Sequence, residues 1–177
     1  AGYVTGPGTK TGIDIKITDP SRLGAGRVAM AAGVAAQYPL PATLVNVSGA
    51  ATTVSCIDGQ SRYLGTVICA GVGPSLQSLV ESAELLVPVA LTAPDRALGT
   101  NSEDSIRSGL IFGTAGMLDG LLGRLEREHP LGTLVATGGE AARAVLPHCS
   151  LAMTYDEHLL SDGMYHIYGR QRPKGAR

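Results

Sequence analysis

Two stretches rich in glycine and threonine could bind phosphate. The first is ATLVNVSGAATTV, residues 42–54, in which an apolar run leads into a turn of small residues and hydroxyls. The second is Ala136-Thr137-Gly138-Gly139, which also follows an apolar run. Short side chains let backbone N–H groups approach an anion, and threonine hydroxyls add donors. A single turn of this kind most often binds nothing, but the two together predict a nucleotide held between them.

Neither stretch matches a common phosphate-binding signature. No GxxxxGK[ST] loop occurs, and no GxGxxG opens a helix after a strand. Phosphate chemistry usually also needs a carboxylate at the strand end, to hold a cation or accept a proton, and here that place carries Asn46. The four histidines show neither HxxxH nor HExxH spacing, and no nucleophile elbow is present. These residues leave two readings open, a working nucleotide site or one that has lost its acidic group.

Length and composition limit the class of protein. The chain has 177 residues, enough for one well-buried domain, and its 44% hydrophobic and 16% charged residues exclude a disordered chain. The net charge is −1 and no basic run precedes residues 170–174, so we expect no nucleic-acid partner. Three scattered cysteines fit a reducing compartment, and we expect a cytoplasmic protein. The most apolar run, residues 108–123, contains Asp119 and is too short for a membrane span, so no membrane is expected either.

The elements that must position these residues follow from hydrophobic spacing. Alternation at Ile13, Ile15 and Ile17 predicts a strand, and Asp19-Pro20-Ser21 is expected to begin a helix that ends at residues 38–39. The other expected elements are strands at 44–47, 54–57, 63–69 and 134–136 and helices at 75–86, 102–128, 140–146 and 156–168. The strands at 54–57 and 63–69 would form a hairpin. Strands followed by helices, with a hairpin between them, predict an α/β fold with a mixed β-sheet flanked by helices.

The long helix expected at residues 102–128 contains a stripe of glycines. The stripe consists of Gly109, Gly113, Gly116, Gly120 and Gly123, whose spacing places them on one helix face. Each costs about 1 kcal/mol relative to alanine in a helix, so the stripe needs a compensating reason. Close approach of another backbone is one reason, and the partner would be either the helix at 156–168 or the same helix of a second subunit. A helix broken into two pieces is the alternative.

Seven short motifs follow one another along the chain. They are PGTKTG (7–12), GAGR (24–27), VNVSGAATT (45–53), YLGTVICAG (63–71), LGTNS (98–102), a helical SG…LDGL (108–121) and ATGG (136–139). In this order they resemble PGxKTG, GADR, VDFGTATT, YLGGAIAPG, IGKNT, SG…GLVDGL and ATGG of the type III pantothenate kinases. Any one motif would carry little weight, but seven in order are specific. The resemblance covers nearly the whole chain.

The resemblance implies an activity and a set of site residues. The family transfers the γ-phosphoryl group of ATP to pantothenate, giving 4'-phosphopantothenate in the first step of coenzyme A synthesis, on a ribonuclease H-like, actin-like ATPase fold. The substrate-binding positions would be Gly24, Ala25, Gly26, Arg27 and Ser102, with Arg27 suited to a carboxylate. The ATP-binding positions would be Gly49, Ala50, Thr52 and Thr53 at the phosphates and Gly138 and Gly139 at the adenosine end.

The resemblance also implies cofactors and an assembly. ATP would act with Mg²⁺ and a monovalent cation, K⁺ or NH₄⁺, whose ligand position is Asn46. Pantothenate and ATP would be the small-molecule partners. The family works as dimers, so we expect a homodimer through the helix that spans Gly109–Gly123.

The sequence departs from the family where the chemistry takes place. Gly26 stands where the family has its proton-accepting aspartate, and Asn46 stands where the cation-binding aspartate would be, so no catalytic residue is intact. The amino-terminal phosphate loop, DxGNT, does not occur in the sequence. We therefore expect residues 1–177 to form one partial domain, the carboxyl-terminal portion of the fold, with impaired activity. The alternative is a non-catalytic remnant that binds a ligand or dimerises, and an unrelated α/β binding domain is a third reading.

Overall fold

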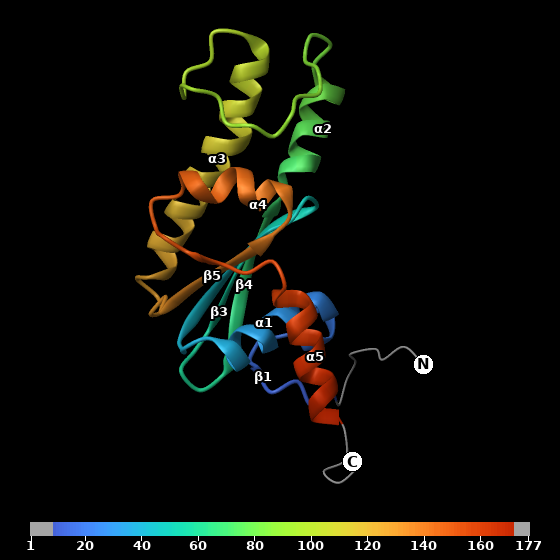
Figure 1. Ribbon diagram of the computed structural model, residues 1–177, viewed down its shortest axis with the longest axis vertical. Helices are drawn as coiled ribbons and strands as arrows, with labels where there is room; N and C mark the ends of the chain where they lie inside the picture. The colour runs from blue at the N-terminus through green and yellow to red at the C-terminus, as the bar shows by residue number, and fades with distance from the viewer. Residues whose placement is uncertain (1–8, 172–177) are drawn as a thin grey trace.

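Six strands form one mixed sheet in the order β1-β4-β3-β2-β5-β6 (Figure 1). The structure is a computed structural model that describes residues 9–171, so residues 7 and 8 of the first motif and 172–174 of the basic tail lie outside the described part. The strands are β1 (Asp14–Ile15), β2 (Ala42–Val47), β3 (Ala51–Ile57), β4 (Arg62–Ala70), β5 (Thr133–Gly138) and β6 (Thr154–Tyr155). β2 and β4 pair antiparallel with β3, whereas the β1–β4, β2–β5 and β5–β6 pairs are parallel. The predicted mixed sheet and the predicted hairpin are confirmed.

Helices cover both faces of this sheet. They are α1 (Ala25–Gln37), α2 (Val72–Ser82), α3 (Ser102–Leu125), α4 (Glu140–Val145) and α5 (Leu159–Gln171), with short 3-10 turns at Pro20–Arg22 and Leu146–His148. On one face, here called the α1 face, α1 and α5 pack on strand residues such as Leu44 and Val135. On the other, here called the α3 face, α3 and α4 pack on residues such as Val45, Val54 and Ala136. Successive side chains of a strand point to opposite faces, which is why neighbours in the sequence belong to different cores.

The helix predicted to begin at Asp19 begins later. Asp19 and Pro20 start only a 3-10 turn, in which the Asp19 carboxylate accepts from the Ser21 N–H, and the chain leaves helical geometry before α1 starts at Ala25. Leu23, at this break, is extended and only 7% exposed. Burying Leu23 in the α1-face core therefore interrupts the helix, and the prediction of one continuous helix was wrong.

Three other elements begin or end at different residues than the sequence predicted. The last helix begins at Leu159 rather than at residue 156, because residues 154–155 form β6 and the Asp156 N–H donates to the Ala136 carbonyl. The first strand shrinks to Asp14–Ile15, and α2 ends at Ser82, before the predicted residue 86. Within residues 9–171, no helix combines the length and apolar composition needed to cross a bilayer.

The glycine stripe lies on an unbroken helix. α3 runs continuously from Ser102 to Leu125, so the alternative of a broken helix was wrong. None of the five glycines has an atom within 4 Å of the position that a Cβ would take, so no described segment packs closely on the stripe. The alternative in which the last helix covers the stripe was also wrong, because α5 packs on α1 instead.

Candidate functional site

Three polar side chains line up across the strands that lead to the two glycine-rich turns. Asn46 of β2 pairs with Thr53 of β3 and with Thr137 of β5. Paired residues of neighbouring strands present their side chains to the same face. Asn46, Thr53 and Thr137 therefore form a row, here called the polar row, near the carboxyl ends of the parallel strands β2 and β5.

The polar row belongs to the α1 face. Leu44 and Val135, two residues earlier on the same strands, lie in the α1-face core. Thr53 is only 6% exposed and Thr137 only 5%, yet neither side chain nor that of Asn46 forms a hydrogen bond within the described part of the chain. Asn46 is partly exposed, and the fully buried side-chain atoms without a partner among the described residues are Thr52 Oγ1 and Arg107 Nε, not the hydroxyls of Thr53 or Thr137. The three polar groups of the row are therefore accessible and have hydrogen-bonding capacity left for a partner from outside.

The first turn is closed on itself and supported by the start of α2. The Ser48 hydroxyl donates to the Ala51 carbonyl over 2.8 Å, which closes the turn around Gly49 and Ala50. A Cβ on Gly71 would lie 2.5 Å from the Gly49 carbonyl oxygen, and the Gly71 N–H donates to the Ala50 carbonyl. Only glycine at position 71 allows this close approach, so the turn is held rigidly against α2.

The second turn lies directly beside the first. Gly138 pairs with Val47, the last residue of β2, and has a φ of +136°. A Cβ on Gly138 would lie 2.2 Å from the Val47 carbonyl oxygen, whereas Gly139 has nothing within 4 Å of its Cβ position. The structure thus brings the two glycine-rich turns together at one edge of the sheet, with Gly139 facing open space.

Thr52 and Thr53, which the sequence could not distinguish, lie on opposite faces. Thr52 alternates with Val54, a member of the α3-face core, and is 1% exposed. Its hydroxyl is buried and has no hydrogen-bond partner among the described residues. Thr53 shares the α1 face with Asn46, so only Thr53 can reach a ligand that contacts the polar row.

The GAGR motif forms the first turn of α1, on the same face as the polar row. Gly24 precedes the helix without a side-chain cap, and Gly26 is exposed. The nearest side-chain atom to a Cβ on Gly26 would be Leu160 Cδ1, at 4.0 Å. Leu160 belongs to the first turn of α5, which starts a few residues after Tyr155. Tyr155 pairs with Ala136 of β5, the residue before Thr137. The first turn of α5 is therefore close to the Gly26 position and follows directly on the strand that pairs with the end of β5.

Arg27 is half-buried and forms no ion pair with the described residues. Its guanidinium Nη2 lies 4.0 Å from the position of a Cβ on Gly24. An arginine without a carboxylate partner, beside a stretch free of side chains, is well placed to bind an anionic group from outside.

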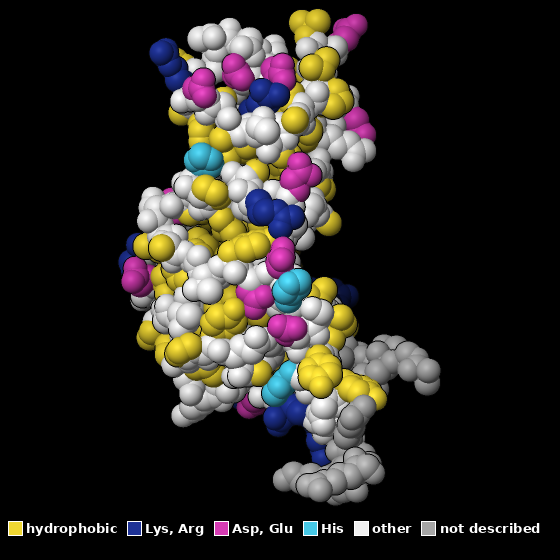
Figure 2. Space-filling model, in the orientation of Figure 1, with side chains coloured by type: hydrophobic (Ala, Val, Ile, Leu, Met, Phe, Trp, Pro, Cys, Tyr) yellow, Lys and Arg dark blue, Asp and Glu magenta, His cyan; other side chains and the backbone are white. Residues whose placement is uncertain are grey.

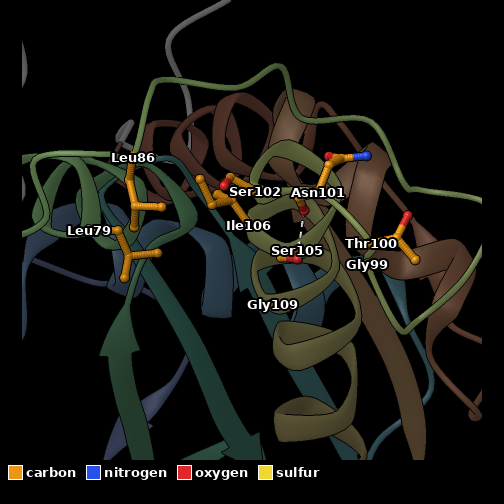
Figure 3. Close-up of a pocket in the computed structure, with 9 residues that line it drawn as sticks. All are labelled: Leu79, Leu86, Gly99, Thr100, Asn101, Ser102, Ser105, Ile106 and Gly109. Carbon is orange, nitrogen blue, oxygen red and sulfur yellow. Dashed lines mark hydrogen bonds between the residues drawn. The ribbon is translucent and has the colours of Figure 1, made fainter.

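Ser102 lies elsewhere. It begins α3, where a cavity of about 580 Å³ opens between Leu79, Leu86 and the first turn of the helix (Figure 3). Asn101 caps this helix by accepting from the Asp104 N–H over 2.8 Å. In Figure 1 the first turn of α3 lies at one end of the molecule, far from α1. The structure does not bring Ser102 together with Gly24–Arg27 within one chain.

No acid belongs to the polar row, although Glu140 is exposed directly after Gly139, at the start of α4. Asp156, which follows β6, accepts from the Tyr38 hydroxyl over 2.8 Å and from the His158 N–H. Burial, followed by the hydrogen bond to Asp156 and its charge, raises the pKa of Tyr38 to about 12. No group of three or more His, Cys, Asp or Glu that could hold a metal occurs in residues 9–171. The arrangement can donate hydrogen bonds to an anion, but no carboxylate belongs to the polar row.

Sequence reasoning placed Thr137 in the second glycine-rich stretch but did not predict its alignment with Asn46, and it missed Tyr155. Tyr155 donates a hydrogen bond to the Gly138 carbonyl, and no local pattern indicated it, because a two-residue strand brings it there.

Comparison with known proteins connects this geometry to a family. Residues 1–124 match the family model described as type III pantothenate kinase. The type III pantothenate kinase of Exiguobacterium sibiricum is 35% identical over 170 residues, which cover 96% of this chain and 66% of that protein. The chain therefore spans slightly less than two thirds of the length of this relative.

Solved structures share the fold. A structure described as a Baf family transcriptional activator from Campylobacter jejuni has a TM-score of 0.61 at 21% identity, covering 92% of this chain and 70% of that one. The activator of 2-hydroxyisocaproyl-CoA dehydratase from Clostridium difficile, with bound ADPNP, has a TM-score of 0.52 at 16% identity, covering 84% and 68%. These likenesses support the predicted actin-like ATPase fold. With the family model matching residues 1–124 and a relative 35% identical, the chain belongs to the type III pantothenate kinase family.

Proposed function

We propose that this chain carries binding surfaces for ATP and pantothenate in the family reaction, the ATP-dependent phosphorylation of pantothenate to 4'-phosphopantothenate. The observation that supports this most is the polar row beside the two glycine-rich turns. Ligands of α/β sheets usually bind outside the carboxyl ends of parallel strands. The hydroxyls of Thr53 and Thr137 and the amide of Asn46 would donate to phosphate oxygens at this edge.

The pantothenate side of the site would be the first turn of α1. Arg27 has no carboxylate partner in the described structure, so its guanidinium can pair with the pantothenate carboxylate. Gly24, Ala25 and Gly26 expose backbone rather than bulky side chains, which leaves room for the substrate next to that charge.

Chemistry would be slow in this chain. Gly26 offers no proton acceptor, and loss of a general base typically removes about 10²–10⁴ in rate. Phosphoryl transfer depends mainly on positioning and charge stabilisation, so the missing base alone would leave slow turnover. The sequence also has no DxGNT loop, and without it the triphosphate would be held from one side only.

The cations implied by the family fit this chain poorly. Mg²⁺ prefers carboxylate and phosphate oxygens, and the polar row has no carboxylate, so Mg²⁺ would arrive bound to ATP. A monovalent cation, K⁺ or NH₄⁺, would meet only neutral oxygens at Asn46 and its neighbours. We therefore assign no step of the reaction to a cation held by this chain.

A homodimer would complete the substrate site. The first turn of α3, which contains Ser102, lies far from α1, which contains Arg27, and the glycine stripe of α3 is open. Large apolar side chains are also exposed in the segment between α2 and α3, including Leu85 at 87% and Leu98 at 83%, and Figure 2 shows hydrophobic side chains at this end of the molecule. A two-fold dimer through α3 would cover the stripe, and each copy could supply Ser102 to the other. We place this dimer in the cytoplasm.

The test is a phosphoryl-transfer assay with labelled ATP and pantothenate on the chain of 177 residues. We expect formation of 4'-phosphopantothenate far below about 1 s⁻¹, the low end of the usual range for kinases. Turnover at or above that rate would show that the positions of Gly26 and Asn46 do not limit the chemistry. Binding of both ligands with no detectable product would favour a non-catalytic, ligand-binding role.

A further inference from the structure

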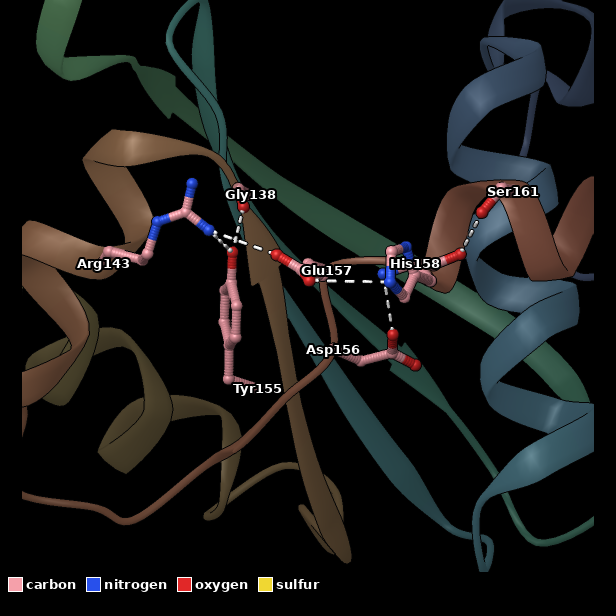
Figure 4. A network of polar contacts seen from close by, with 7 residues as sticks. All are labelled: Gly138, Arg143, Tyr155, Asp156, Glu157, His158 and Ser161. Carbon is pink, nitrogen blue, oxygen red and sulfur yellow. Dashed lines mark hydrogen bonds and ion pairs between the residues drawn. The ribbon is translucent and has the colours of Figure 1, made fainter.

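Tyr155 is hydrogen-bonded to the second glycine-rich turn. Its hydroxyl donates to the carbonyl oxygen of Gly138 over 2.5 Å, across 17 residues of sequence (Figure 4). Tyr155 is the last residue of β6 and pairs with Ala136, so its ring lies beside the end of β5. The Gly138 carbonyl is therefore held from the β6 side of the sheet.

The same peptide is constrained on its other side. Gly138 approaches the end of β2 so closely that a Cβ would lie 2.2 Å from the Val47 carbonyl oxygen. A peptide unit is planar and trans, so fixing the Gly138 carbonyl also fixes the Gly139 N–H in the opposite direction. That N–H has no acceptor among residues 9–171, and nothing lies within 4 Å of the Cβ position of Gly139. The turn thus holds a free donor toward open space.

A second link orients the Tyr155 hydroxyl. Arg143 Nη1 lies 3.4 Å from the Tyr155 hydroxyl and 3.3 Å from Glu157 Oε2. A tyrosine hydroxyl can accept one hydrogen bond while it donates another, so Arg143 and Gly138 can be satisfied together. The side chains of Arg143 and Glu157 are 60% and 54% exposed, and exposed ion pairs contribute little to stability. This network therefore orients the Tyr155 hydroxyl and adds little to the free energy of unfolding.

Resting on the proposed nucleotide site, we infer that Tyr155 is a positioning residue for the nucleotide. It holds the Gly138–Gly139 peptide so that the Gly139 N–H donates to an oxygen of bound ATP. Tyr155 also lines a cavity of about 520 Å³ with Leu146, Pro147 and Met153. A phenylalanine in its place would keep that wall and remove only the hydroxyl.

The experiment compares the wild-type chain with Tyr155→Phe by calorimetric titration with MgATP. We expect the Kd to rise about three- to tenfold, the effect of one hydrogen bond, with the melting temperature unchanged. Without nucleotide, the backbone amide resonance of Gly139 should shift in the ¹H–¹⁵N spectrum. Tyr165→Phe is the matched control, because Tyr165 is 78% exposed on α5, and it should change neither the Kd nor the Gly139 resonance.

The outcomes separate this inference from the proposed function. Wild-type protein that fails to bind MgATP would overturn both. Wild-type binding with an equal Kd for Tyr155→Phe, or an unshifted Gly139 resonance, would overturn the positioning role alone. A melting temperature that falls in Tyr155→Phe, in parallel with the affinity, would assign Tyr155 a structural role and overturn the inference as well.

Discussion

Gly26 is the second residue of α1, in a first turn that contains no acidic residue. An aspartate there has room, since the nearest side-chain atom to its Cβ would be 4.0 Å away. This substitution would replace a glycine within the helix and add a negative charge at the helix N-terminus, and both changes favour the helix. We expect Gly26→Asp to raise the free energy of unfolding by about 1 kcal/mol, measured by urea denaturation.

The matched control is Gly26→Asn, whose side chain has nearly the same shape without the charge. It should raise the free energy of unfolding by less than Gly26→Asp does. Gly26→Asp should also raise any residual phosphoryl transfer, provided that the phosphate loop is supplied. A loss of stability in Gly26→Asp would mean that the first turn of α1 is more crowded than described.

Tyr38 makes stability sensitive to alkaline pH. Its pKa is about 12 in the folded protein, against about 10 in an unfolded chain, because of burial and the hydrogen bond to Asp156. Folding therefore favours the protonated hydroxyl, and this contribution is complete below about pH 10 and lost as the pH rises toward 12. We expect Tyr38→Phe to flatten the decline in unfolding free energy over this range, measured by denaturation at a series of pH values.

For Tyr38, the control is Tyr165→Phe, which removes an exposed hydroxyl and should keep the decline of the wild-type protein. Parallel declines in wild type and Tyr38→Phe would show that other groups govern alkaline unfolding.

At the residue scale, the sequence predicted part of the site. The positions of Asn46 and of the glycines at 49, 138 and 139 followed from an apolar run that ends in small residues. Thr137 was part of the second stretch, but its alignment with Asn46 depends on the register of β5 against β2, a pairing of residues 91 positions apart that no local pattern encodes. The choice between Thr52 and Thr53 likewise required knowing which sheet face α1 covers.

At the scale of elements, the strand and helix order was predicted except for the two-residue strand β6, and the packing of glycines was not. The sequence indicated a close helix contact at the α3 stripe, yet the described structure has its close crossing between α1 and α5. There a Cβ on Gly163 would lie 1.9 Å from the Ala29 carbonyl oxygen, and one on Gly33 would lie 2.9 Å from the Leu159 carbonyl oxygen. Spacing shows which glycines share a face, but not what that face meets.

The α1–α5 crossing should be intolerant of any added atom. Gly163→Ala would force the two helix backbones apart, because the neighbouring atoms are backbone rather than flexible side chains. We expect a loss of about 3 kcal/mol of unfolding free energy, or failure to fold, measured by thermal and chemical denaturation. Gly169→Ala, on the same helix with nothing within 4 Å of its Cβ, is the control and should be neutral or slightly stabilising. Equal effects of the two changes would contradict the described crossing.

At the scale of the whole molecule, α2 and the first half of α3 extend away from the α1–α5 end (Figure 1). This extension contains Ser102 and the first two glycines of the stripe, Gly109 and Gly113, whereas Arg27 belongs to α1. The two sets of substrate-binding positions that the resemblance predicted therefore lie apart within one chain. The sequence could not reveal the separation, since it depends on the direction in which α3 leaves the sheet.

Gly116→Leu tests whether the stripe joins two copies. A Cβ at Gly116 meets nothing within 4 Å in the single chain, and leucine favours helix over glycine, so the monomer should fold at least as stably. The added side chain should instead block a close α3–α3 contact. We expect sedimentation at tens of micromolar to show a dimer for wild type and a monomer for Gly116→Leu.

The control for the stripe is Gly169→Leu, an equally open glycine on α5, which should remain dimeric. A wild-type monomer, or a dimer that survives Gly116→Leu, would exclude the stripe as the interface.

The central claim is that the polar row on the α1 face binds ATP, and calorimetric titration of MgATP into wild type, Thr53→Val and Thr52→Val tests it most directly. Both changes replace a hydroxyl by a methyl group on neighbouring residues of one strand, but only Thr53 shares a face with Asn46. The account predicts saturable wild-type binding with a Kd of about 1 mM or tighter, weakened about three- to tenfold by Thr53→Val and unchanged by Thr52→Val. No saturable binding by the wild-type chain, or equal weakening by the two substitutions, would contradict it.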